Sequence, residues 1–198
     1  MKNQREQIEQ TISDHLEAVT LLNDACGEVL ETLVQRTEGA LRAGGKICFF
    51  GNGGSAADAQ HLATEFVVRY TRQRAALASI AFTTDASALT AGGNDFGFEA
   101  VFARQVEALC GPDDVVVGIS TSGTSANVVA GLAAARKLGA LTVLFTGKTG
   151  SEGARAEDQV DLILAAPSDV TARVQECHLL AGHILCDLVE EAFVADGK

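Results

Sequence analysis

The sequence lacks long apolar runs and has few helix breakers. Its 198 residues include only two prolines, Pro112 and Pro167, and both fall in predicted loops. Apolar runs such as Ile47 to Phe50 are far shorter than the roughly 20 residues that a membrane-spanning helix needs. The polar N-terminus also lacks the apolar core and the cleavage site of a signal peptide. We therefore expect a cytoplasmic protein with no membrane partner.

Positive charge is scarce as well. Fifteen Lys and Arg residues face 26 Asp and Glu residues, which gives a formal net charge of −11. A field of this sign repels polyanions at long range and argues against nucleic acid as a partner. Any anionic ligand must therefore be held by local chemistry.

The five cysteines do not form a metal-binding or disulfide pattern. They are odd in number and scattered, and no C-x-x-C pair occurs among them. We expect reduced thiols, mostly in the core.

The length predicts one domain over residues 1–198, since about 100–200 residues per domain is usual. From Ile8 to Leu41, apolar residues recur at steps of three and four, which predicts helices over residues 1–44. We expect a break near Asn23, where a cap could start a second helix, and a stop at Gly44 and Gly45.

Residues 45–198 alternate short apolar runs with helix-length segments, a pattern typical of βαβ units and a parallel sheet. The expected strands are 46–50, about 78–83, 115–119, 141–145 and 162–165. The expected helices are 56–68, 98–109, 126–137 and 171–194. The predicted fold class is α/β, a doubly wound five-stranded parallel sheet with an N-terminal helical extension.

A glycine-rich turn, Gly51 to Ala56, directly follows the first predicted strand. Such a turn presents backbone N–H groups and a helix N-terminus to an anion. The turn also loosely fits a dinucleotide fingerprint, but the acidic residue expected about 20 positions on is absent, and Asp85 lies much further along. We predict an anion site that does not bind a dinucleotide.

A second turn, Ser120 to Ser125, carries five hydroxyls and also leads from a strand into a helix. Hydroxyls and N–H groups at a helix start can hold a phosphate without a cation. A solvated, serine-capped turn is the alternative. Two such loops at the carboxyl ends of parallel strands favour a ligand site.

The helix after the glycine loop carries His61 and Glu65, four residues apart and on one face. Such a pair is half of a metal site, although it is more often a surface hydrogen bond. The last predicted helix adds polar residues in apolar surroundings, where they need a partner such as zinc or, for histidine, a hydrogen bond in the core. These residues are Gln175, Glu176, His178 and His183.

Gln175 and His183 are eight residues apart, roughly 12 Å along a helix axis. Both can bind one ion only if it lies between them or if two chains contribute.

Five segments together resemble the phosphoheptose isomerase family of sugar isomerase (SIS) domain proteins. They are Gly51-Asn52-Gly53-Gly54-Ser55, His61-x-x-x-Glu65, Gly93-Asn94-Asp95-Phe96-Gly97, Ser120-Thr121-Ser122-Gly123-x-Ser125-Ala126-Asn127 and Gln175-Glu176-x-His178-x-x-x-x-His183. The resemblance covers nearly the whole chain and implies a SIS-type fold. It also implies a homotetramer that converts sedoheptulose 7-phosphate to D-glycero-D-manno-heptose 7-phosphate, the first step toward nucleotide-activated heptose.

The same resemblance implies roles for individual residues. The implied ligands of Zn²⁺ are His61, Glu65, Gln175 and His183. The implied substrate contacts are Asn52, Gly53, Gly54, Ser55, Arg69, Asn94, Asp95, Ser120, Thr121, Ser122, Ser125 and Gln175. One departure is Ala172, where some members have an acidic residue, and nearby Asp169 is a candidate to replace it.

Interconversion of a ketose and an aldose requires a base and an acid on opposite sides of an enediol. Glu65 is the candidate base and His183 the candidate acid, as the resemblance also implies. If both contact zinc, the metal can polarise the carbonyl.

Two rival functions belong to other classes. A non-catalytic tetrameric SIS protein that binds a replication initiator or another protein would not need the four metal-ligand candidates together. A sugar-phosphate sensor that regulates transcription usually carries an added DNA-binding domain, and the sequence shows no such domain. The sequence therefore favours the enzyme.

Overall fold

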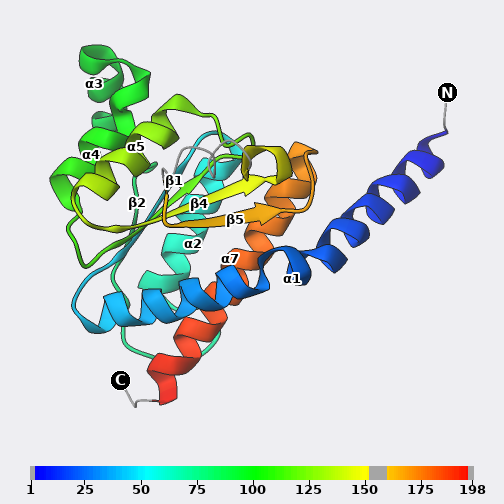
Figure 1. Cartoon of the computed structure of the whole chain (residues 1–198), viewed down its shortest axis with the longest axis horizontal. Coiled ribbons are helices and arrows are strands. Elements are labelled where there is room, and N and C mark those ends of the chain that lie inside the picture. Colours follow the sequence, from blue (N-terminus) through cyan, green and yellow to red (C-terminus); the bar gives the residue numbers. More distant parts are fainter. Residues whose placement is uncertain (1–2, 152–159, 196–198) are drawn as a thin grey trace.

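The structure, a computed structural model, describes residues 3–151 and 160–195. It contains one parallel sheet with strand order β2-β1-β3-β4-β5 (Figure 1). The strands are β1 (Ile47–Gly51), β2 (Ser79–Ala81), β3 (Val115–Ile119), β4 (Leu141–Gly147) and β5 (Leu162–Ala166). The predicted five-stranded α/β fold is confirmed, although β2 is shorter than expected.

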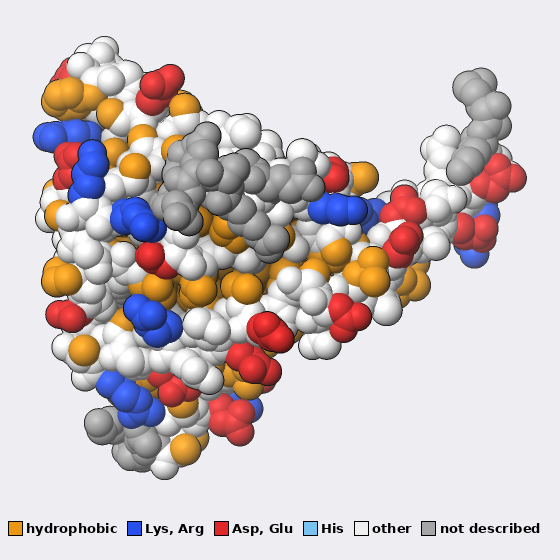
Figure 2. All heavy atoms as spheres, viewed as in Figure 1, with side chains coloured by type: hydrophobic (Ala, Val, Ile, Leu, Met, Phe, Trp, Pro, Cys, Tyr) orange, Lys and Arg blue, Asp and Glu red, His pale blue; other side chains and the backbone are white. Residues whose placement is uncertain are grey.

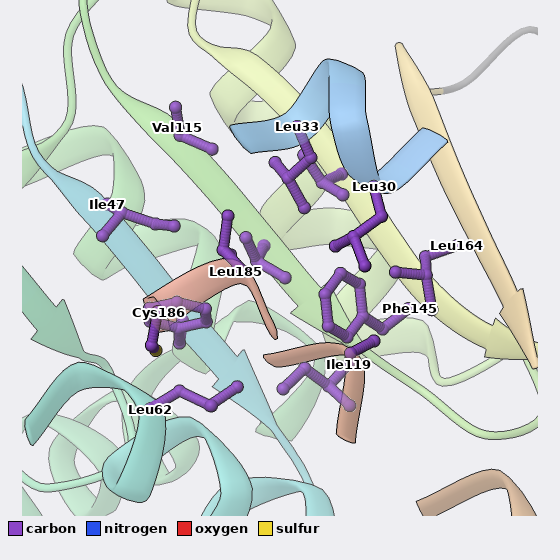
Figure 3. Packing of buried hydrophobic residues seen from close by; sticks show 14 of the residues in the cluster. Leu30, Leu33, Ile47, Leu62, Val115, Ile119, Phe145, Leu164, Leu185 and Cys186 are labelled. Carbon is purple, nitrogen blue, oxygen red and sulfur yellow. The ribbon is translucent and has the colours of Figure 1, made fainter. Parts of the chain in front are cut away.

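Helices cover both faces of the sheet. They are α1 (Gln4–Arg42), α2 (Gly54–Val67), α3 (Ala86–Phe96), the short 3-10 helix η1 (Phe98–Ala100), α4 (Val101–Leu109), α5 (Ala126–Lys137) and α7 (Thr171–Ala195). Strand residues alternate between two cores, since successive side chains of a strand point to opposite faces. One core packs Leu33 of α1, Leu62 of α2 and Leu185 of α7 against the sheet (Figure 3). The other packs Phe102 of α4 and Leu132 of α5 against the opposite face.

The N-terminal region is one continuous helix, so the predicted division into two helices is wrong. α1 begins with a capping box formed by Asn3 and Glu6. At the expected break, the exposed Asn23 side chain bonds to that of Asp24 and caps no helix. The buried stripe continues across this point through Leu22, Cys26 and Leu30. Packing of that stripe therefore outweighs the local capping signal.

The first turns of α1 project beyond the rest of the chain (Figure 1). On this projection Ile8, Ile12 and Leu16 are 54%, 55% and 58% exposed. Hydrophobic side chains form a band that continues from the body of the molecule onto the projection (Figure 2). No helix in the described ranges combines the length and the apolar character needed to cross a membrane.

The sequence did not predict α3. Its N-cap is Asp85, whose carboxylate accepts the Ala88 N–H at 2.9 Å. None of the residues of α3 is fully buried, and the helix contains the adjacent glycines Gly92 and Gly93, which weaken the local helix signal. It brings the motif residues Asn94 and Asp95 into its last turn.

Candidate active site

The two predicted anion loops lie at the point where the strand order reverses. From β1 the chain passes to β2 on one side of the sheet and then to β3 on the other side. Ligands of open α/β sheets bind at such a switch point, outside the carboxyl ends of the strands. The glycine loop follows β1 and the serine loop follows β3, so the fold places both at this crevice.

An amide pair joins the two loops. Asn52 and Asn127 each donate Nδ2 to the other's Oδ1 at 2.8 Å. Asn127 is buried at the start of α5. It lay within a recognised motif but was not among the predicted site residues.

The glycine loop is shaped by conformation and by close packing. Gly53 has a φ of 57°, which favours glycine, and it precedes α2 without a side-chain cap. A Cβ on Gly54 would lie 2.2 Å from Gln175 Nε2. Gln175 of α7 therefore packs directly on the start of α2, where Ser55 is buried.

The hydroxyls of the serine loop pair with one another. Ser120 Oγ and Ser125 Oγ are 2.9 Å apart, and Ser122 Oγ lies 3.0 Å from Thr124 Oγ1. Ser125 is the N-cap residue of α5, yet its side chain makes no capping bond. The first N–H groups of α2 and α5 thus have no side-chain cap, and an anion can take that place.

The histidine candidates meet between α2 and α7. His61 Nε2 and His183 Nε2 are 2.8 Å apart, and Glu65 Oε1 lies 3.6 Å from His61 Nε2. Gly182 permits this close approach, because a Cβ there would lie 2.5 Å from Leu62 Cδ2. Burial, followed by the neighbouring His61, lowers the pKa of His183. The neutral imidazole that results is the form that binds metals.

The side chains of His61, Glu65 and His183 are of types that bind zinc, although they are not arranged as a complete set of ligands. Among the described residues, no three or more His, Cys, Asp or Glu side chains are arranged to hold an ion. Two imidazole nitrogens nevertheless face each other beside a carboxylate. Imidazole nitrogen and carboxylate oxygen are donor types that zinc binds in proteins.

The fold does not bring Gln175 to the histidine pair. Gln175 packs at Gly54, whereas His61 follows Gly54 by seven residues, about 10 Å along the helix. For a Gln175 amide to bind the same ion as His183, the amide must leave Gly54, or the Gln175 of a neighbouring chain must bind instead. From the sequence, the open alternatives were an ion midway between Gln175 and His183 or ligands from two chains.

Other expected site residues lie apart from this group. The exposed Asn94 and Asp95 bond to each other at 2.7 Å on α3. Arg69 is exposed just after α2, where its Nη1 lies 3.4 Å from Thr71 O. Asp169 accepts the Thr149 N–H, and this bond lowers the pKa of its carboxyl group.

Two polar residues of α7 have structural partners. His178 is buried, and its Nε2 lies 3.0 Å from Thr146 O, so it is a core histidine. Burial lowers the pKa of His178 to about 4. Glu176 accepts hydrogen bonds from Arg173 and lies 2.7 Å from His15 Nδ1, which ties α7 to α1.

Two residues of the site, Asp58 and Tyr70, were not among the predicted site residues. Asp58 lies on the same face of α2 as His61, with Oδ2 buried and no hydrogen-bond partner for that atom, and burial raises its pKa. The Tyr70 ring packs against His183, with ring centroids 5.5 Å apart. The i,i+3 spacing of Asp58 and His61 was a usable signal, whereas the loop around Tyr70 offered none.

The sequence and the fold match a known class of proteins. A family model for the SIS domain matches residues 6–147. The chain therefore belongs to the SIS domain family. It is 51% identical over 183 residues to the phosphoheptose isomerase of Paramagnetospirillum magneticum, covering 92% of this chain and 94% of that protein.

Two further relatives agree. The phosphoheptose isomerase of Aquifex aeolicus is 55% identical over 152 residues, covering 77% of this chain and 78% of that protein. The solved phosphoheptose isomerase structure from Neisseria gonorrhoeae superposes with a TM-score of 0.88 at 39% identity, covering 96% of this chain and 100% of that chain. Within the SIS proteins, the chain belongs to the phosphoheptose isomerase family and is an isomerase of the aldose–ketose class. This membership supports a sugar-phosphate isomerase function.

Proposed function

We propose that the chain converts sedoheptulose 7-phosphate to D-glycero-D-manno-heptose 7-phosphate through an enediol, as the first step toward nucleotide-activated heptose. The observation that carries the proposal is a spacing on α2. Gly54 at the anion loop, His61 and Glu65 recur at steps of seven and four residues, so they share one face of the helix. Gly54 and His61 are about 10 Å apart along the helix axis. This distance suits an extended sugar phosphate, with its phosphate at the loops and its carbonyl at the histidines.

The phosphate would bind without a cationic side chain. The uncapped N-termini of α2 and α5 offer backbone N–H groups, and Ser55, Ser120, Thr121, Ser122 and Ser125 add hydroxyls. Asn52, Gly53 and Gly54 shape the first loop. Local donors of this kind hold an anion despite the net charge of −11.

Proton transfer would use Glu65 and His183. In this proposal the Glu65 carboxylate removes the proton from the carbon next to the carbonyl. His183 supplies a proton to the carbonyl oxygen, which gives the enediol. Glu65 then returns its proton to the former carbonyl carbon, while the hydroxyl proton on the neighbouring carbon passes back to His183, so that the aldose forms and both groups are restored. A positioned acid or base of this kind contributes about 10²–10⁴-fold. The Glu65 side chain is only 18% exposed, which limits the access of water to the base. Arg69, Asn94, Asp95 and Gln175 would contact the sugar.

The group His61, Glu65 and His183, with Gln175, would hold Zn²⁺. A bound zinc ion would supply Lewis-acid polarisation of the carbonyl and stabilise developing negative charge on its oxygen. His61 has no other proposed role, so it serves only to hold the ion.

We also propose that residues 1–198 form one domain that assembles as a cytoplasmic homotetramer without nucleic-acid or membrane partners. The exposed apolar edge of α1, with Ile8, Ile12 and Leu16, supports assembly, because a lone chain would leave this edge in water. Light scattering should give the mass of four chains. An active, stable monomer would contradict the proposal.

The reaction can be tested directly with the purified, zinc-loaded protein. NMR should show the aldose product accumulating from sedoheptulose 7-phosphate. Ketose phosphates with five and six carbons serve as a length series, and they should react more slowly because they cannot reach from the loops to the histidines. No turnover of the seven-carbon substrate with zinc present would refute the function, and equal rates for all three would refute the spacing argument.

A further inference from the structure

A carboxylate is buried at the far end of α7 from the anion loops. Glu190 is 1% exposed and lies on the apolar stripe of the helix beside Cys186, Val189 and Phe193. A charge in such surroundings is costly unless it is fully paired. Glu190 takes no part in the proposed proton transfers or metal binding. Its role must therefore be inferred from its hydrogen-bond partners.

The partners of Glu190 are consecutive backbone N–H groups of the segment after α2. Its Oε1 accepts the N–H of Tyr70 at 2.8 Å, and its Oε2 accepts those of Thr71 at 2.8 Å and Arg72 at 2.7 Å. The Thr71 hydroxyl adds a bond of 3.2 Å. Burial opposes ionisation, but these N–H donors outweigh it and lower the pKa of Glu190. One side chain therefore fixes the path of residues 70–72.

Arg74 completes this arrangement and ties it to α2. Its Nε lies 3.3 Å from Glu190 Oε1, and both side chains are 1% exposed. The Arg74 guanidinium also donates to the carbonyl oxygens of Glu65 and Phe66, at 2.7 and 2.9 Å, in the last turn of α2. The segment is thus held to the end of the helix that carries the candidate base.

The segment carries one residue that contacts the proposed acid, and the residue just before it is a proposed substrate contact. The Tyr70 ring lies against His183, with centroids 5.5 Å apart and planes at 34°. Arg69, a proposed contact of the sugar phosphate, directly precedes Tyr70. An apolar residue at position 190 could fill the same space, but it could not hold three N–H groups in register.

We propose that Glu190 is a positioning residue for the isomerase, which holds residues 69–72 so that Tyr70 packs on His183 and Arg69 stays beside the substrate. The inference rests on the proposed function. Loss of Tyr70 should affect the proton-transfer step and so lower kcat. Loss of Arg69 should affect binding and so raise KM. Loss of Glu190 should do both.

The test compares Glu190→Gln with the matched control Glu191→Gln, which removes the same charge at an exposed neighbouring position. Glutamine turns one acceptor oxygen into a donor that faces N–H groups, so at least one bond to the segment is lost. Glu190→Gln should lower kcat by about 10- to 100-fold, as expected for a displacement near 1 Å, and it should also raise KM. The control should match wild type.

A second pair of variants keeps the test decisive if Glu190→Gln folds poorly. Tyr70→Leu removes the ring but keeps the backbone bond to Glu190, and Tyr70→Phe keeps the ring. Tyr70→Leu should lower kcat while KM changes by less than about 3-fold, and Tyr70→Phe, which keeps the ring on His183, should lower kcat by less than Tyr70→Leu does. Wild-type kcat in Tyr70→Leu would overturn the proposal and leave Glu190 with a structural role only.

An NMR measurement on the metal-free protein separates this inference from the proposed function. The chain has four histidines, so the ring protons of His183 can be assigned from a His183→Gln spectrum. The ring current of Tyr70 should shift these protons, and Glu190→Gln and Tyr70→Leu should both remove that shift. Unchanged His183 signals in Glu190→Gln would overturn the positioning role even if the enzyme is active. If the two variants lose the shift of the His183 protons as expected but the wild-type protein shows no turnover, only the proposed function is refuted.

Discussion

Replacing Gly54 with alanine tests whether the contact between Gly54 and Gln175 matters for the reaction. The added Cβ would lie 2.2 Å from Gln175 Nε2, 3.1 Å from Cδ and 3.3 Å from Oε1. Only the flexible end of one side chain stands in the way, so the fold should adjust at little cost. Alanine also has a higher helix propensity than glycine. We expect a melting temperature equal to that of wild type or slightly higher.

Activity should fall despite this intact stability. The Gln175 amide must retreat by about 1.2 Å to reach ordinary contact distance, and a misplacement near 1 Å can cost about 10²-fold in rate. We therefore expect kcat/KM of Gly54→Ala to drop by about 10- to 100-fold. The control is Gly39→Ala in α1, where the added methyl group meets nothing within 4 Å.

A double-mutant cycle identifies the cause of the loss. If Gly54→Ala acts by displacing Gln175, it should add no further loss once Gln175→Ala has removed the amide. The assay is the NMR measurement of product formation, with melting curves recorded for each variant. An equal loss of kcat/KM in both backgrounds would refute the reasoning and would indicate that the methyl group obstructs the substrate itself.

Three other changes test the remaining features. His61→Ala should weaken metal binding by about 10–100-fold and regain activity in added zinc. His183→Ala should stay about 10²–10⁴-fold slower at any zinc concentration, because the acid is lost. Equal rescue of both variants by zinc would mean that another group is the acid. Asn127→Ala should lower the free energy of unfolding by about 1–3 kcal/mol in urea titrations, since Asn52 loses a buried partner. The pKa of Glu190 is lower in the folded than in the unfolded chain. Its stabilising effect is therefore present above its ordinary pKa of 4.5 and is lost as the pH falls through its lower pKa in the folded chain. The free energy of unfolding should accordingly change less steeply with pH on the acid side for Glu190→Gln than for wild type.

The sheet was predictable because β1, β3 and β4 are buried along their whole length and so appear as short apolar runs, and because helix-length segments separate most of the strands. The bounds of β3 and α5 match the predictions, since each is framed by a loop with strong turn residues. The break near Asn23 was a wrong prediction, because a local cap signal competes with burial of Leu22 and Cys26, which only the folded chain reveals. α3 was missed because none of its residues is fully buried and because Gly92 and Gly93 within it weaken the local helix signal.

The candidate site was predictable only where spacing along one helix carried it. His61 and Glu65 could be paired from their four-residue step, and the two loops from their positions after strands. The contact between His61 and His183 spans 122 residues and depends on how α2 packs on α7. The role of Glu190 was also missed, although a glutamate on an apolar stripe carries the same signal that singled out His178: a buried polar group needs a partner.

The paired amides of Asn52 and Asn127 have one further consequence. Neither side chain gains or loses a proton in the range where the protein is folded, so the link between the two loops does not change with acidity. A carboxylate or an imidazole in the same place would loosen as it titrated. The phosphate-binding face and the proton-transfer group can therefore respond to acid independently. The pH dependence of the rate should therefore contain no contribution from the link between the two loops.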